Sequence, residues 1–237
     1  MTWSIIAKDA ATGRVGIIVA TKFFAVGSRV PHIRTGVGAL ASQAYMNPYY
    51  GARGLALMAA GATAEDCVKL LTAADDGRDV RQLHAMDKDG HSAAYTGAKC
   101  IDWCGHTLRD GYSVAGNMLA GEAVVRDTAD TFAARAELPF ARRLIAAMLA
   151  GENAGGDKRG KQSAALLIHD SEDYSLLDLR VDDHTDPLAE LARLEAVARE
   201  RWVHFRRLMP RAGDPAGLID RTNIDAIIAA SIAEKYE

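Results

Sequence analysis

The chain has few of the features that mark a secreted or membrane-bound protein. Its 237 residues include only three cysteines, at positions 67, 100 and 104. An odd and low cysteine count argues against a disulfide framework. No apolar run reaches the length of about 20 residues that spans a bilayer. The N-terminus also lacks the basic, apolar and small-residue regions of a signal peptide. These absences predict a cytoplasmic protein with no membrane partner.

The chain also lacks an excess of charge of either sign. It carries 28 basic and 31 acidic side chains, a formal net charge of -3. That balance does not fit the basic footprint of a nucleic-acid-binding protein. Five arginines do gather between positions 199 and 211, where a helix would place them on a solvated face or an oligomer contact. We expect a small-molecule or short-peptide partner, no nucleic acid, and a homo-oligomer.

Residues that could bind a metal occur in two places. Cys100, Cys104 and His106 lie close together in the sequence, but their spacing fits no common zinc pattern and a fourth ligand is missing. Buried or half-buried thiols explain them better. Asp182 and Asp183, next to His184, could serve as metal ligands or in acid–base chemistry, but an ion-paired strand end and helix N-terminus is the preferred interpretation. We expect no metal and no cofactor.

Apolar patterning predicts grouped strands alternating with grouped helices. Strands are predicted over 2–8, 14–21, 36–43, 80–87, 91–96, 105–115, 163–168 and 176–181. Helices are predicted over 50–60, 63–75, 122–149 with a break at Pro139, 187–208 and 218–235, and 23–35 is predicted to be irregular. Strands joined by hairpins favour layered antiparallel sheets over alternating β-α-β units. We expect one domain over 1–185 and a helical C-terminal extension over 186–237, packed on the same domain or on a partner subunit.

Thr2 is the first candidate for chemistry. If Met1 is removed, this residue carries a hydroxyl nucleophile and a free α-amine, whose reference pKa of about 7.7–8.0 allows it to act as a base near neutral pH. A threonine hydroxyl needs such an adjacent base. Thr2 fits the start of an ordinary strand equally well, and its position alone favours that interpretation.

Gly116 and Asn117 are predicted to follow a strand and to precede a helix. There, the Asn117 amide and neighbouring backbone N–H groups could donate to a developing oxyanion. The alternative is a turn or a helix N-cap, which asparagine also favours. The residues alone favour this second interpretation.

A polar loop rich in glycine precedes the strand predicted at 163. Gly155, Gly156, Asp157 and Arg159 lie in it and could help bind a carboxylate or a phosphate. The loop does not match the phosphate-binding P-loop, because no helix follows it. A solvated loop is an equally good explanation.

Gln43 and Asn47 flank a junction between a predicted strand and a predicted helix. Tyrosines at 45, 49 and 50 surround them. Polar groups beside aromatic rings suit a binding pocket. The alternative is turn chemistry around the Asn47-Pro48 pair.

Five segments together resemble a known family. They are TWSIIAKD at 2–9, SQAYMNPYYG at 42–51, GYSVAGNMLAG at 111–121, GGDKRGKQSAA at 155–165 and DLRVDDH at 178–184. In this order they resemble the bacterial and archaeal family catalogued as domain of unknown function 1028, over roughly residues 1–187. The family itself resembles the N-terminal-nucleophile (Ntn) hydrolases.

The resemblance implies a fold and an activity. The implied fold is α+β, a four-layer αββα sandwich, here with a helical C-terminal tail. Thr2 would be the nucleophile at the open end of the first strand, and Asn117 with nearby N–H groups would hold the oxyanion. The expected function is hydrolysis of a small amide or peptide bond. A non-catalytic small-molecule-binding protein and an oligomeric structural protein are the alternatives.

Overall fold

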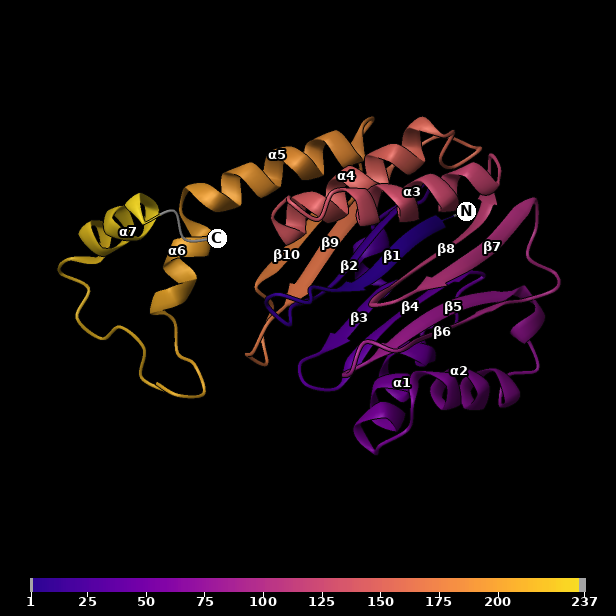
Figure 1. Cartoon of the computed structure of the whole chain (residues 1–237), viewed down its shortest axis with the longest axis horizontal. Helices are drawn as coiled ribbons and strands as arrows, with labels where there is room; N and C mark the ends of the chain where they lie inside the picture. Colours follow the sequence, from indigo (N-terminus) through magenta and orange to yellow (C-terminus); the bar gives the residue numbers. More distant parts are fainter. Residues whose placement is uncertain (1, 235–237) are drawn as a thin grey trace.

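The computed structural model describes residues 2–234, an α+β fold with two antiparallel sheets (Figure 1). Its strands are β1 (Thr2–Lys8), β2 (Val15–Thr21), β3 (Pro31–Arg34), β4 (Gly38–Ala44), β5 (Arg81–Asp87), β6 (Ser92–Thr96), β7 (Trp103–Arg109), β8 (Tyr112–Leu119), β9 (Ser163–His169) and β10 (Leu177–Val181). The seven α-helices of the described residues are α1 (Tyr49–Ala59), α2 (Ala64–Ala73), α3 (Glu122–Ala134), α4 (Phe140–Asn153), α5 (Pro187–Glu200), α6 (Trp202–Phe205) and α7 (Ile224–Ala233). The strand order is β10-β9-β2-β1-β8-β7 in one sheet and β3-β4-β5-β6 in the other.

Strand β1 lies between β2 and β8, and its side chains alternate between two layers. Trp3, Ile5 and Ala7 pack in the apolar cluster that α3, α4 and α5 cover. Ile6 packs in a second cluster, between the two sheets. Such alternation follows from the two-residue period of a strand. Thr2 and Ser4 share the parity of Ile6, so they lie on the face toward the second sheet.

The outer face of the four-stranded sheet is covered by α1 and α2 (Figure 1). Leu40 and Leu83 contribute from the sheet, and Cys67 and Leu71 from α2. Thr63 caps α2 by accepting a hydrogen bond from the Asp66 N–H at 3.1 Å, and the reciprocal bond of a capping box is present. The predicted start of this helix is confirmed.

Two predictions about strands were wrong. Residues 23–35 include the edge strand β3, which pairs with β4 and begins at Pro31, a position where an edge strand tolerates the missing N–H. The single strand predicted at 105–115 is the hairpin of β7 and β8, which turns at Asp110 and Gly111. Gly111 has φ +73°, as such a turn requires. Asn117 consequently lies inside β8, neither in a turn nor at a helix N-cap.

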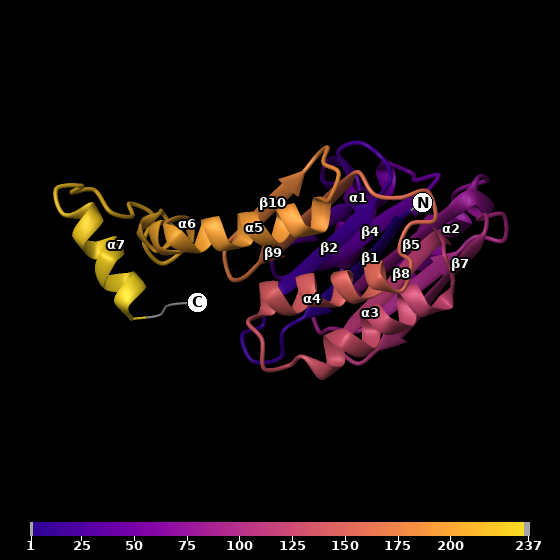
Figure 2. The ribbon, with the colours of Figure 1, turned by 90° about the horizontal axis from the view of Figure 1, so that it is seen from above.

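The C-terminal part differs from its prediction in helix length. The helix predicted over 187–208 breaks at Arg201, where φ is -147° and ψ is -45°. The last helix is the shorter α7, and position 235 of its predicted range lies outside the described residues. Leu188 and Leu191 of α5 are fully buried in the cluster that contains Trp3. Beyond α5, the chain extends past the sheets to one side (Figure 2). Within residues 2–234, the helices are too short or too polar to cross a membrane.

Candidate active site

Thr2 and Asn117 are brought together by the pairing of β1 with β8. They are register partners, and Asn117 Nδ2 donates a hydrogen bond to the Thr2 carbonyl at 3.3 Å. On the other side, Thr2 is the register partner of Thr21, and the Thr2 hydroxyl donates to Thr21 Oγ1 at 3.1 Å. Thr2 is 8% exposed, so its hydroxyl lies in a largely desolvated position with polar neighbours on two strands.

Gln82 of β5 connects three of the predicted residues from the opposite sheet. Its buried Oε1 accepts from Gln43 Nε2 at 2.8 Å and from Asn117 Nδ2 at 3.0 Å. Its Nε2 donates to the Gly116 carbonyl at 2.8 Å. Gln82 was not singled out from the sequence, although it occupies an inward position of the alternating stretch 80–87, where a polar residue is unusual.

The Asn117 side chain uses both of its N–H groups in these bonds. Its Oδ1 is buried and has no hydrogen-bond partner among the described residues. A buried acceptor without a donor costs free energy, and such groups require an explanation. Here the acceptor without a donor is Asn117 Oδ1, and Asn117 pairs directly with Thr2 across β8 and β1.

A cavity of about 330 Å³ opens beside Thr2. Thr2, Thr21 and Gln43 give it polar groups, and the rest of its lining is mostly apolar: Phe23, Phe24, Val26, Arg29, Val30, Ala44, Tyr45 and Met46. A second cavity of about 470 Å³ shares Ala44 and Tyr45 with the first and reaches Asn117. An apolar hollow with a few convergent polar groups is the usual form of a ligand site.

Strained backbone gathers around these two cavities. In the described chain, the non-glycine residues with positive φ are Ala25 (54°), Ala44 (65°), Asp102 (54°) and Met118 (55°). Ala44 and Met118 line the cavities, and Ala25 and Asp102 are direct chain neighbours of residues that do. Non-glycine residues with positive φ are uncommon and tend to cluster at functional sites. This clustering makes this end of the sheets the candidate functional end.

The glycine-rich loop lies next to the site but does not line the Thr2 cavity. Asp157, whose side chain is 1% exposed, accepts from the Lys22 backbone N–H at 2.7 Å and forms an ion pair with Arg159 at 3.2 Å. Gly155 and Gly156 have φ of 114° and 49° and allow the loop to turn there. Of these four residues, Asp157 holds the chain that follows β2 at Thr21, through the Lys22 N–H.

Asn47 lies apart from Thr2, near the outer helices. Its Nδ2 donates to Asp75 Oδ2 at 3.0 Å, and it lines a cavity of about 690 Å³ between α1 and α2. Burial acts to raise the pKa of Asp75, but hydrogen bonds from Asn47, Tyr50, the Gly77 N–H and Arg81 hold it well below its usual range. Asp75 is thus a firmly ionised structural carboxylate, and Asn47 is one of its donors.

His84 is buried between the sheets and bridges two serines. Ser4 Oγ lies 2.8 Å from its Nε2 and Ser113 Oγ 2.8 Å from its Nδ1. Burial lowers the pKa of His84 to about 3, with a smaller contribution from the charge of His106. The imidazole is therefore neutral at physiological pH and acts as a hydrogen-bonding bridge.

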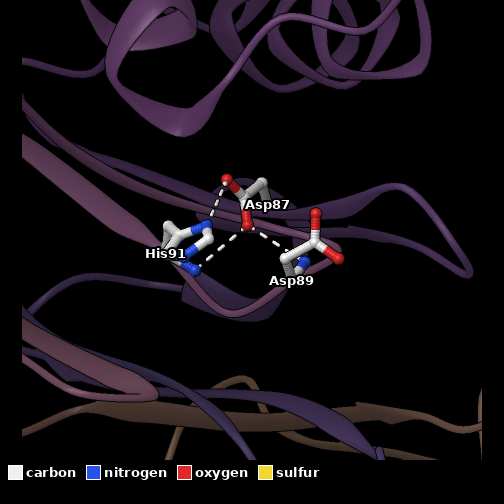
Figure 3. Close-up of side chains that lie close together, drawn as sticks. All are labelled: Asp87, Asp89 and His91. Carbon is white, nitrogen blue, oxygen red and sulfur yellow. Dashed lines mark hydrogen bonds and ion pairs between the residues drawn. The ribbon is translucent and has the colours of Figure 1, made fainter.

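A cluster that resembles a metal site occupies the β5–β6 turn (Figure 3). Asp87, Asp89 and His91 form it, and it was not predicted from the sequence. Asp87 Oδ1 already accepts the backbone N–H groups of Asp89 and His91, each at 3.0 Å. Lys88 Nζ lies 2.8 Å from Asp89 Oδ2. These bonds are explained by the hairpin turn itself.

Comparisons with known proteins agree with the sequence motifs. A family model described as "Family of unknown function (DUF1028)" matches residues 2–191. The crystal structure of protein SPO2555 from Silicibacter pomeroyi, of that same family, is 34% identical, with a TM-score of 0.86 over 92% of this chain and 99% of that one. Anbu, an ancestral beta-subunit from Yersinia bercovieri, is 10% identical, with a TM-score of 0.41 over 83% of this chain and 94% of that one, which is only a distant similarity. No curated protein matches the chain.

Proposed function

Because the chain belongs to the family of unknown function DUF1028, whose description assigns no activity, we propose its function from the residues around Thr2. The proposed function is hydrolysis of a small amide or a short peptide, with Thr2 as the nucleophile once Met1 has been removed. One observation carries it: Thr2 begins a central strand and, through its register partners and a cavity of about 330 Å³, combines a desolvated hydroxyl with room for a ligand.

The arrangement of layers supports the proposal. Helices cover the outer face of each sheet, and the two sheets face each other across an apolar cluster (Figure 1). We propose that this is the four-layer αββα sandwich of the Ntn hydrolases. In that fold, a nucleophile at the start of a central strand has the position that Thr2 has here. Fold alone does not give activity, so the activity is proposed from the residues of the site.

The proposed reaction has two steps. The Thr2 hydroxyl attacks the amide carbonyl while the Thr2 α-amine takes its proton. Collapse of the tetrahedral intermediate breaks the C–N bond, and the leaving amine receives that proton. Water then hydrolyses the acyl ester and restores the hydroxyl. Since the free α-amine is the base, kcat/KM should rise with pH through about 7.7–8.0.

Asn117 has a defined part in this proposal. It holds the Thr2 carbonyl, and its second N–H donates to Gln82 Oε1. We propose that a substrate oxyanion replaces Gln82 as the acceptor of that second N–H. Such a donor stabilises the charge that develops on the carbonyl oxygen.

The test is turnover by protein in which intact mass has verified the loss of Met1, so that Thr2 has a free α-amine. Small amides and N-acylated amino acids serve as substrates, with release of amine followed by mass spectrometry. Thr2→Ala should abolish hydrolysis, whereas Thr2→Ser, which retains a hydroxyl, should retain part of it. Activity that survives in Thr2→Ala, or a native protein that keeps Met1, would refute the assignment.

A non-catalytic binding protein on the same fold is the second candidate. Both N–H groups of the Asn117 amide already have partners, so neither is left to hold an oxyanion, and this favours binding without catalysis. This candidate predicts thermal stabilisation by ligands without turnover. Any hydrolysis that is lost in Thr2→Ala would exclude it.

The C-terminal region supports a proposal about assembly. We propose that 186–237 is an extension of the 1–185 domain, and that α7 helps to form a homo-oligomer. Ile227 and Ile232 of α7 are 38% and 45% exposed, which is unusual for isoleucines on one short helix. Light scattering after size-exclusion chromatography tests this. The double substitution Ile227→Asp and Ile232→Asp should give a monomer, and a wild-type monomer would contradict the proposal.

A further inference from the structure

We infer that the cavity beside Thr2 takes a small ligand with one bulky apolar group, preferably aromatic, and one carboxylate. The ligand would be the substrate of the reaction proposed above, and to that extent the inference rests on the proposed function. The substrate would then be an N-acylated apolar amino acid. The amine product would keep the carboxylate. The inference adds two recognition elements, an aromatic rim and an unpaired arginine.

The rim of the cavity exposes three large aromatic side chains. Phe23 is 69% exposed, Phe24 is 62% exposed and Tyr45 is 77% exposed, and all three line the cavity. Single exposed apolar residues are common on protein surfaces, but several around one hollow mark a binding site. An aromatic or branched apolar group of a ligand would shield these rings from water, with the gain that accompanies apolar burial.

The segment that presents the two phenylalanines is held firmly by its backbone. The Phe23 carbonyl accepts from Ser163 Oγ at 2.5 Å, and the Val26 N–H donates to the same hydroxyl at 3.1 Å. The Ala25 N–H donates to the Asp182 carbonyl at 2.9 Å. The rings are thus exposed although their backbone is fixed. A preorganised surface of this kind loses less conformational entropy when a ligand binds.

Arg29 supplies a positive charge on the same cavity. Within residues 2–234, its guanidinium forms no hydrogen bond, ion pair or stacking contact. In contrast, Arg53 lies over the Tyr49 ring at 4.9 Å and Arg81 over the Tyr45 ring at 5.3 Å. A guanidinium binds a carboxylate through two parallel N–H···O bonds. Arg29 is therefore the residue of this cavity that selects an anionic group.

The size of the cavity limits the ligand. Its volume of about 330 Å³ lies at the lower end of the range for small-molecule pockets, about 300–1,000 Å³. That volume fits one substituted amino acid and is too small to enclose a long peptide. A ligand of this size can reach the Thr2 hydroxyl, the aromatic rim and Arg29 at the same time, since all of them line one hollow.

Binding without turnover tests the inference separately from the reaction. The Thr2→Ala protein is titrated by calorimetry or NMR with N-acetyl-L-phenylalanine, with its neutral amide and with N-acetylglycine. The acid should bind roughly fivefold more tightly than the amide, as expected for one partly exposed ion pair. Arg29→Gln should remove that difference, and Phe24→Ala should weaken binding of both phenylalanine ligands about tenfold. Arg53→Gln, a matched arginine outside the cavity, should change neither.

The outcomes separate this inference from the proposed function. Equal binding of acid and amide, no effect of Arg29→Gln, or N-acetylglycine binding as tightly as N-acetyl-L-phenylalanine would overturn the inference. Absence of binding by all three ligands at millimolar concentration would also overturn it. Selective binding with no hydrolysis by the protein with free Thr2 would support the inference and refute the hydrolase. Hydrolysis of amides without this selectivity would support the hydrolase and overturn the inference about the ligand.

Discussion

Replacement of His84 by glutamine should flatten the dependence of stability on pH. His84 is fully buried, and its pKa in the folded protein is about 3, against 6.5 for an unperturbed histidine. Between these values the unfolded chain binds a proton that the folded protein does not. The stabilisation due to neutral His84 is therefore complete above about pH 6.5 and is lost as pH falls toward 3.

The magnitude follows from the two pKa values. Each pH unit inside this window removes about 1.4 kcal/mol, so the free energy of unfolding should fall by about 2 kcal/mol between pH 7 and pH 5 because of His84 alone. Burial also lowers the pKa of His32, His106 and His169, so the wild type should lose more than this. The difference between wild type and variant isolates the contribution of His84.

Urea unfolding at pH 7, 6 and 5, followed by tryptophan fluorescence, measures the effect. The control is Ser113→Ala, which removes the 2.8 Å hydrogen bond to His84 Nδ1 but retains the imidazole. It should lower stability by about 1 kcal/mol at every pH and keep the wild-type slope. If His84→Gln loses as much stability between pH 7 and pH 5 as the wild type, the reasoning is wrong.

Three further predictions concern the surroundings of the site and the C-terminal helices. Asp157→Ala should cost about 3 kcal/mol, because it leaves the Lys22 N–H without its acceptor and breaks an ion pair on a side chain that is 1% exposed. In differential scanning calorimetry this corresponds to a fall in Tm of about 6–12 °C, and Asp157→Asn should cost less. Gly116→Ala would place a Cβ 2.4 Å from Leu119 Cδ1 and should cost about 1–3 kcal/mol. Gly121→Ala, with no atom within 4 Å of its Cβ, should cost only about 0.5–1 kcal/mol by urea unfolding, because alanine is a poorer N-cap of α3 than glycine. Leu191→Ala should cost about 2–5 kcal/mol in a single transition, since this side chain lies in the main core, and two separate transitions would show instead that α5 unfolds independently.

The strands and helices with strong local signals were predictable from the sequence. The Thr63 capping box and the Pro139 break both lie where the sequence indicates them. The hairpin at Asp110 and Gly111 was missed although it has a known turn signal. The break at Arg201 has no such signal, because no proline or glycine occurs between 188 and 208. The residues after the break contact distant parts of the chain, as in the 2.6 Å ion pair of Arg206 with Asp170, and no local pattern announces such contacts.

The candidate site was predictable only in part, because its residues meet through long-range strand pairing. Thr2 and Asn117 are separated by 115 residues in the chain and become neighbours only when β1 pairs with β8. Gln82 joins them from the other sheet, and no local pattern assigns it that contact. Asn47 and Gln43 are close in sequence but diverge, because β4 ends at Ala44 with φ +65° and the chain leaves toward α1.

The position of Thr2 has a practical consequence for work with this protein. Thr2 is flanked by strands on both sides, and it lines the cavity. A purification tag fused ahead of residue 2 would keep the Thr2 nitrogen in a peptide bond, and an amide nitrogen cannot accept the proton of the hydroxyl. Such a tag would hide the activity proposed above, even in a perfectly folded preparation. An affinity handle placed beyond α7, which lies at the far side of the molecule from the start of β1 (Figure 2), avoids this artefact.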